Sequence, residues 1–423
     1  MSVVPIGRRR WPSRRGNRAA FARRFGPAWT DTLQHALTRG DPSADALVAI
    51  DGARGVEVRR QLARALVDGL AALDEPDDAV VALLADAERV PTHVDAALIA
   101  SGPPGWYTVP LPLHLVSMSA GALVGLYAAS SIARVLGSTG CLLNGTEHRL
   151  RETARWLSTS MLPGSLAPGR EGYVATLQVR LLHAHMRRAS RRRGHDEAAF
   201  GVPVCQADLA FTWLGFTLAS MRAEAAAGFD LDAEEIAGTY RYWWQTAHLL
   251  GLDADLVGDI RGHDDAERLE EMLWMTMGET ADASARLAAR TLDVVGAELE
   301  RLVPLPGGAG DAVLRALVRR FHGAERAGTL DIGGGRALER LLGPLATAAR
   351  VHRSVSRRDA ARWEAARADR VGEALAREVA ARSDGPNAYE RLVTALDASV
   401  AAGAVTVPDA SLTSGPEALP EAA

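Results

Sequence analysis

Lysine is absent from this chain of 423 residues, and all 48 of its basic residues are arginines. Reactions that need a lysine amine are therefore excluded, including Schiff-base catalysis and phosphate binding by a P-loop or kinase lysine. The two cysteines, Cys141 and Cys205, are too few for a disulfide framework or a four-cysteine zinc site. No CxxCH motif occurs, which excludes covalently attached c-type haem.

The overall charge is also small: the net charge is −4 and 48% of the residues are hydrophobic, an ordinary composition that indicates no nucleic-acid partner. The arginine-rich start is not followed by the apolar run of a signal peptide. We therefore expect residues 1–27 to be a disordered basic tail, and the protein to be cytoplasmic, where its few cysteines stay reduced.

Apolar residues recur at helical spacing over most of the chain, as at Val58, Leu62 and Leu66, and no alternation of strands and helices is found. This pattern predicts an all-α fold, with one helical domain over residues 28–402. The Pro-, Ser- and Ala-rich end, residues 403–423, lacks a core-forming pattern, and we expect it to be disordered.

The longest apolar run, Leu115–Leu136, approaches the length of a membrane span. It contains several Gly and Ser residues and carries Arg134 near its end. We interpret it as a buried core helix whose small residues let a neighbouring helix or a flat ligand approach closely. An integral membrane span is the alternative.

Several catalytic motifs are excluded. The glycine-rich segment Leu330–Arg336 resembles the loop of S-adenosylmethionine methyltransferases, but helical patterns surround it where that loop needs a strand and a parallel sheet. No histidine has a glutamate three residues before it, as helical di-iron sites require. HExxH and GxSxG are absent too. What remains is a haem site with histidine as its only protein ligand.

The segment Tyr173–Arg193 predicts a helix with one distinctive face. Arg180, His183 and Arg187 fall at positions i, i+3 and i+7, so a histidine lies between two guanidinium groups. This face suits a bound anion or an anionic cofactor, and His185 points about 200° away from it. On these residues alone, the simpler interpretation is a hydrogen-bonded core histidine followed by a solvated basic face.

The preceding predicted helix, residues 144–161, carries a second polar face. Arg149, Glu152, Thr153 and Trp156 share it, which brings a guanidinium, a carboxylate and a hydroxyl together beside an apolar helix. The alternative is that Arg149 and Glu152 form an exposed intrahelical ion pair.

Together these segments resemble the MpaB/latex-clearing-protein oxygenase family, over roughly Leu115–Leu302. The residues that carry the resemblance are Arg149 with Thr153, the run Arg180-x-x-His183-Ala-x-x-Arg187, the segment from Pro203 to Asp208, and the segment from Tyr240 to Gly251. The resemblance implies a globin-related helical core and non-covalent haem b with His183 as the axial ligand of the iron. It makes Arg180 and Arg187 candidates for binding the haem propionates or for fixing the ligand helix.

The chain departs from the rubber-cleaving members of this family at two positions. Their lysine on the distal side of the iron is replaced by Glu152, and their distal glutamate by Ala133. Rubber cleavage by their mechanism is therefore disfavoured. Thr153 and Arg149 are candidate donors to bound oxygen, and Glu152 is a candidate proton acceptor.

The resemblance thus predicts a haem-dependent oxygenase that uses O2 on a small lipophilic substrate, such as an isoprenoid alkene, with an electron donor that the sequence does not identify. Apolar helices over Leu115–Leu136 and Ala207–Met221 would wall the substrate pocket. The alternatives are a haem-binding sensor or carrier without catalysis, and a haem-free helical interaction protein.

Overall fold

The computed structural model describes residues 10–91, 94–138, 146–278 and 282–383, and within these ranges it contains helices and no strand. The all-α prediction is confirmed. The predicted disordered end, residues 403–423, and the last residues of the predicted helical domain, 384–402, lie outside the described residues.

In chain order the helices are α1 (Arg18–Leu37), α2 (Pro42–Val48), α3 (Gly52–Asp68), η2 (Leu70–Ala72), α4 (Asp78–Glu88), α5 (Ala96–Ser101), η3 (Trp106–Thr108), α6 (Leu111–Val116), η4 (Ser117–Leu123), α7 (Val124–Tyr127), α8 (Ser130–Ser138), α10 (Thr146–Ser160), α11 (Glu171–Arg192), α12 (Glu197–Phe200), α13 (Gln206–Leu214), η5 (Gly215–Ala219), α14 (Ser220–Ala226), α15 (Ala233–Leu249), α16 (Ala254–Val257), α17 (His263–Trp274), α18 (Asp282–Leu302), α19 (Ala309–Thr329), α20 (Arg336–Ser356) and α21 (Ala360–Ser383).

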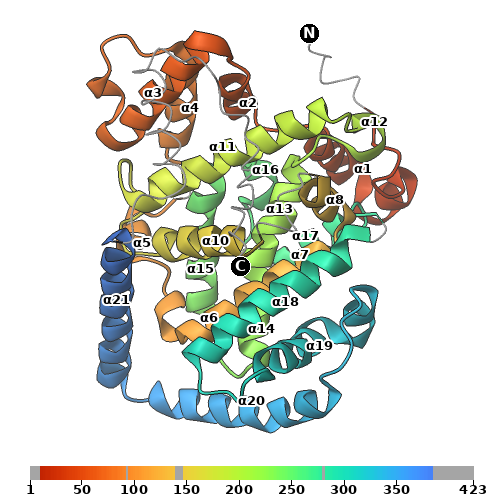
Figure 1. The fold of residues 1–423 in the computed structure, drawn as a ribbon, viewed down its shortest axis with the longest axis vertical. Coiled ribbons are helices and arrows are strands. Elements are labelled where there is room, and N and C mark those ends of the chain that lie inside the picture. Colours follow the sequence, from red (N-terminus) through yellow and green to blue (C-terminus); the bar gives the residue numbers. More distant parts are fainter. Residues whose placement is uncertain (1–9, 92–93, 139–145, 279–281, 384–423) are drawn as a thin grey trace, which may run out of the picture.

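The helices pack around two hydrophobic cores. The larger core lies among α11, α13 and α15 and includes Leu177, Leu209 and Trp243. The smaller core joins α7 to α18 and α19, with Val124 and Leu292 fully buried in it. Helix α11 crosses the upper half of the molecule, whereas α20 and α21 form its lower and left edges (Figure 1). The long helix α11 is therefore positioned by contacts with several elements at once.

The start of the chain is folded, contrary to the expected tail over residues 1–27. Asn17 caps α1, which begins at Arg18. Arg15 is 2% exposed and donates to the buried carboxylate of Asp208 at 2.7 Å. A buried carboxylate needs a partner, and Arg15 supplies a guanidinium to Asp208 in the first turn of α13. The prediction of a disordered tail is wrong from residue 10 onward.

The apolar run Leu115–Leu136 is not one helix. It divides into the end of α6, the π-helix η4, α7 and, after a break at residues 128–129, α8. Its small residues do allow close approach: a Cβ added to Gly121 would lie 2.7 Å from Ala223 Cβ. In the same way, a Cβ on Gly215 of the second π-helix, η5, would lie 2.9 Å from the side chain of Leu126. Both apolar segments therefore pack directly against each other.

No single helix within the described ranges combines the length and the apolar composition needed to cross a membrane. One bent pair, Ala96–Thr108 with Leu111–Tyr127, meets that test jointly, and its two parts are inclined at 92°.

Candidate functional site

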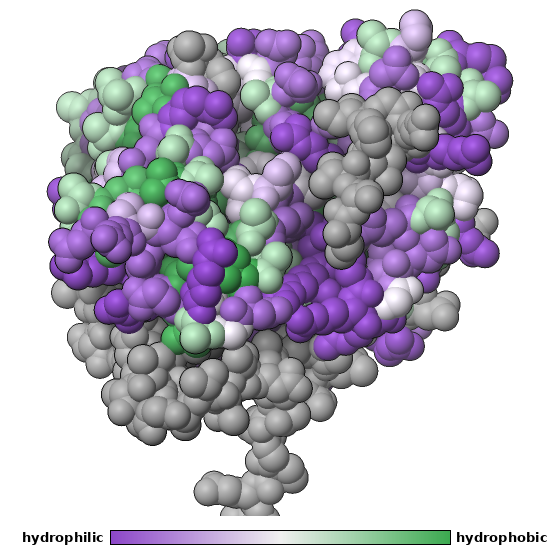
Figure 2. Space-filling model, turned by 90° about the horizontal axis from the view of Figure 1, so that it is seen from above, coloured by the Kyte–Doolittle hydropathy of each residue, from purple (hydrophilic) through white to green (hydrophobic). Residues whose placement is uncertain are grey.

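Helix α11 carries the central candidate residues, and its ends follow from the sequence. Glu171 lies in its first turn and Arg191 and Arg192 in its last, so the charges complement the helix dipole at both ends. Gly194 then adopts a φ of 81°, which ends the helix. Arg191 and Arg192 are exposed. Seen from above the view of Figure 1, this side of the molecule is mostly hydrophilic, with hydrophobic residues gathered on the left (Figure 2).

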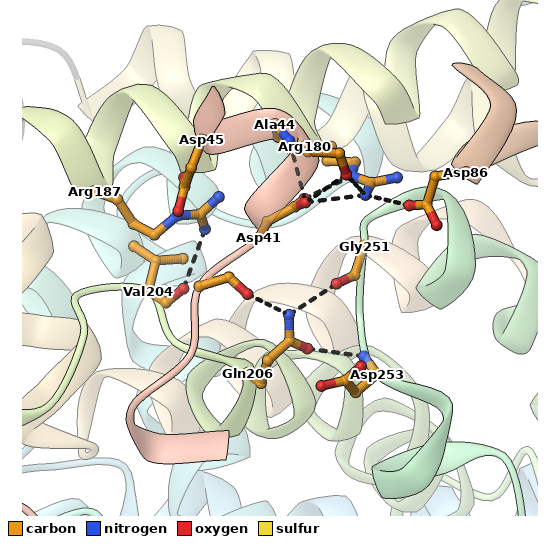
Figure 3. Close-up of polar contacts among 12 residues, drawn as sticks. Asp41, Ala44, Asp45, Asp86, Arg180, Arg187, Val204, Gln206, Gly251 and Asp253 are labelled. Atoms are coloured by element: carbon orange, nitrogen blue, oxygen red, sulfur yellow. Dashed lines mark hydrogen bonds and ion pairs between the residues drawn. The ribbon is translucent and has the colours of Figure 1, made fainter. Parts of the chain in front are cut away.

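Arg180 is held by two carboxylates from other parts of the chain. Its side chain is 2% exposed, and its Nε and Nη2 atoms donate to Asp41 at 2.6 and 3.0 Å. Nη2 also donates to Asp86 at 2.6 Å, so the guanidinium lies between α4 and the start of α2 (Figure 3). The pKa of Asp41 is lowered: burial raises it, but hydrogen bonds from Arg180 outweigh this.

Arg187 follows Arg180 by seven residues, about two helical turns, and makes a similar contact from the same face of α11. Its Nε donates to Asp45 of α2 at 2.6 Å, and its Nη1 donates to the carbonyl oxygen of Val204 at 3.2 Å (Figure 3). Arg187 is fully buried. The ion pairs of Arg180 and Arg187 hold α11 in place, and a role of either residue in binding haem propionates stays a prediction. They clamp α11 onto α2.

His183 lies between these two arginines and is half-buried. Burial, together with the nearby charge of Arg187, lowers the pKa of its imidazole to about 4, against a weaker opposite effect of Asp41. The ring is therefore neutral near pH 7, which is the form that binds metal ions. Its Nδ1 is buried and has no hydrogen-bond partner among the described residues. At this atom, the interpretation of His183 as a hydrogen-bonded core histidine does not hold.

Helices α10 and α11 form an antiparallel pair that brings the two predicted faces together. Trp156 Nε1 of α10 donates to Thr176 Oγ1 of α11 at 3.1 Å. Arg149 precedes Trp156 by seven residues, and His183 follows Thr176 by seven. Seven residues are about two helical turns, or about 10.5 Å, so each residue lies about two turns from this contact along its own helix.

The three candidate residues of α10 differ in their freedom to act. Arg149 Nη2 donates to the hydroxyl of Tyr127 at 3.1 Å, while its buried Nε has no acceptor among the described residues. Thr153 donates its hydroxyl proton to the carbonyl oxygen of Arg149 at 2.9 Å. Glu152 is half-buried, and no ion pair with Arg149 occurs within the described part of the chain. Arg149 is therefore the donor that remains available.

Tyr127 was not among the predicted site residues. It is 1% exposed, and its hydroxyl also accepts from Thr291 of α18 at 3.3 Å. Nothing in the sequence relates Tyr127 to Arg149, because the two residues lie on separate helices, α7 and α10. Ala133, at the expected acid position, is fully buried on α8 and adds no polar group.

Arg180 also lines a polar cleft with a volume of about 460 Å³. Its charged walls are largely paired, with Arg39 held by Asp253 at 3.0 Å and Arg180 held by Asp41. Gln206 closes one side by donating to the carbonyl oxygen of Gly251 and accepting from the backbone of Asp253 (Figure 3). Such a lining does not suit an apolar substrate, and His183 does not contribute to it.

One buried carboxylate, that of Glu224, is not among the site residues predicted from the sequence. Glu224 of α14 is 4% exposed and accepts hydrogen bonds from His114 Nδ1 and Ser117 Oγ, both at 2.9 Å. His114 Nε2 contacts the carbonyl oxygen of Trp106 at 2.7 Å, so it carries a proton. The pair of His114 and Glu224 lies beside a cavity of only about 20 Å³, room for about one water molecule.

Comparison with known proteins places this arrangement in a family. Residues 111–368 match the family described as ER-bound oxygenase mpaB/B'/Rubber oxygenase, catalytic domain. That range covers more than half of the chain. The chain belongs to this oxygenase family. The resemblance inferred from the sequence is confirmed.

The fold of this chain is similar to that of latex clearing protein, whose structure was solved in the closed state. The two structures superpose with a TM-score of 0.58 and share 18% sequence identity. The match covers 79% of this chain and 91% of that chain. At this identity the likeness concerns the fold, and function must be argued from the site. A search of curated protein sequences found no match.

The family match includes α10 and α11 but not the carboxylates that clamp α11. Asp41, Asp45 and Asp86 all precede residue 111. In this member of the mpaB/rubber oxygenase family, the N-terminal helices therefore supply the charges that position the candidate ligand helix.

The lowered pKa of His183 predicts a loss of stability in acid. In haem-free protein, unfolded His183 binds a proton below its ordinary pKa of 6.5, whereas the folded ring does not until about pH 4. The contribution of the neutral His183 to the free energy of unfolding is therefore fully present above pH 6.5. It is lost as the pH falls from 6.5 to about 4. Urea unfolding at pH 7.5, 5.5 and 4.5 should show a smaller decline for His183→Gln than for the wild type. Equal declines would contradict the shift.

Proposed function

We propose that this protein is a haem-dependent oxygenase that uses O2 to cleave a C=C bond in a lipophilic, isoprenoid-type substrate. Membership of an oxygenase family supports the reaction class. The observation that carries the proposal is His183, a neutral, half-buried imidazole whose Nδ1 has no partner among the described residues.

The residues present fit a haem group. An imidazole nitrogen without a hydrogen bond costs stability when buried, about 1–3 kcal/mol, unless a ligand engages the ring. His183 would hold the iron, and the haem, when bound, supplies the binding and activation of O2. Cleavage of one C=C bond by one O2 molecule yields two carbonyl groups, which balances atoms and electrons.

The surrounding residues have positioning and electrostatic roles in this proposal. The ion pairs of Arg180 and Arg187 fix the rotation and height of α11, and with them the direction of the His183 ring. Arg149 retains a buried Nε–H that can donate to a developing negative charge. The carboxylate of Glu152 is the proton acceptor on the same helix face, in place of the acid missing at Ala133.

A second candidate function, a haem sensor or carrier, is favoured by one observation. The Thr153 hydroxyl proton is directed to the carbonyl oxygen of Arg149, so this residue does not offer a donor to bound oxygen in this arrangement. With a lysine also missing, the chain has fewer groups for oxygen chemistry than its family resemblance predicts.

Two measurements on one sample separate these functions. We expect protein titrated with haemin to show a Soret band, and the reduced protein to consume O2 with squalene but not with squalane, the saturated analogue of the same carbon skeleton. Carbonyl products from squalene would establish the oxygenase. A Soret band without oxygen uptake would instead support the sensor or carrier, and the absence of any band would overturn both.

A further inference from the structure

Helix α20 presents an unusual surface. Four of its large apolar side chains are exposed: Leu341 and Leu345 each by 64%, Val351 by 59% and Val355 by 54%. At 100° per residue these four, called here the outer stripe, fall within about 120° of one another. From Leu341 to Val355 the stripe is about 21 Å long. A surface helix ordinarily turns polar residues to this side.

The opposite side of α20 already has its partners. Ala346 is buried, and Arg353 donates from Nη1 to the carbonyl oxygen of Thr108 at 2.6 Å and from Nε to that of Asp230 at 3.0 Å. The outer stripe is therefore not needed to attach the helix. Its apolar residues form a second face that points away from the molecule.

The charge around the outer stripe indicates what covers it. Helix α20 contains four arginines and one glutamate, and the glutamate, Glu339, is paired with Arg319. Arg336, Arg340 and Arg358, just beyond the helix end, are exposed and have no ion-pair partner among the described residues. By helical geometry all three lie along one flank of the stripe. An apolar stripe flanked by arginines is the pattern of a helix lying in a membrane interface.

We propose that α20 binds the surface of an anionic lipid bilayer, with the outer stripe inserted among the acyl chains and the arginines at the level of the headgroup phosphates. Its location favours a bilayer over a protein partner, because α20 lies along an edge of the molecule, where it can meet a planar surface (Figure 1). A partner helix would instead require a groove. This binding is independent of the proposed oxygenase chemistry.

Sedimentation with vesicles tests the proposal on the full-length protein. We expect binding to vesicles of equal parts phosphatidylglycerol and phosphatidylcholine, and much weaker binding to phosphatidylcholine alone. The variant Leu341→Ser/Leu345→Ser should bind at least about tenfold more weakly, because each serine removes most of a leucine's transfer free energy. Arg336→Glu/Arg340→Glu should lose the preference for the anionic lipid.

The matched control is Val67→Ser/Val90→Ser, since these valines are 61% and 66% exposed and Val67 lies on α3, far from α20 (Figure 1). It should bind vesicles like the wild type. Circular dichroism should show all variants folded, because every substituted residue is exposed. The proposal is overturned if the wild type does not bind, or if the stripe variant binds equally well. It is also overturned if light scattering shows a dimer that the stripe variant disperses while vesicle binding stays absent.

Discussion

Replacing His183 with alanine should abolish the Soret band of the haemin-loaded protein or shift it strongly. The neutral imidazole has a nitrogen lone pair that can bind iron, whereas the guanidinium groups of Arg180 and Arg187 are protonated and paired with carboxylates. Loss of the axial ligand removes the bond between the protein and the iron of a non-covalent haem. The measurement is a visible spectrum of oxidised and reduced protein after titration with haemin.

His185→Ala is the matched control, since this histidine lies on the same helix but is exposed on the other side. Its spectrum should equal that of the wild type. In His183→Gly, added imidazole should restore the band, which a purely structural role would not predict. The haem-free His183→Leu variant should be at least as stable as the wild type, because it removes a buried nitrogen without a partner. An unchanged Soret band in His183→Ala would refute the assignment.

Replacing Arg180 with methionine should destabilise the protein by about 3–5 kcal/mol, because breaking a buried ion pair leaves its partner charge uncompensated. Asp41, with a 2% exposed side chain, would keep its hydrogen bonds from Ser43 and Ala44 but lose the guanidinium that lowers its pKa. Unfolding in urea, monitored by circular dichroism, measures the change.

Arg188→Met on the same helix is the comparison for this loss. Arg188 pairs with Asp51, whose side chain is 67% exposed, and donates to the carbonyl oxygen of Val48, so its loss should destabilise the protein much less than the loss of Arg180. If the two variants proved equally stable, the clamp would not position α11. A double variant, Arg180→Met with Asp41→Leu, should recover part of the stability by removing the unpaired charge.

The helical elements around the site could be predicted because their signals are local. Charged residues at both ends and the glycine after it mark the limits of α11. Helical spacing alone places His183 between two arginines on one face. The break in Leu115–Leu136 was missed because a π-helix has no distinct local signature and depends on packing against η5.

The pairings of the site were not predictable in the same way. Arg180 is separated from Asp41 by 139 residues and from Asp86 by 94. Asp41 also caps the start of α2, so its place in the sequence indicates a local role and does not indicate the pairing with Arg180. Likewise, the sequence around Arg15 indicates a basic tail, and only the folded structure brings Arg15 to Asp208.

By itself, the sequence determined that the fold is helical, that lysine chemistry, a disulfide framework and a four-cysteine zinc site are excluded, and that His183 lies between Arg180 and Arg187. These properties depend on composition and on the 3.6-residue period of a single helix. Only the tertiary structure decided that the two arginines clamp α11 while the histidine keeps an unpaired nitrogen. Electrostatic partners are chosen by distance in space and by burial, and a one-dimensional pattern records neither.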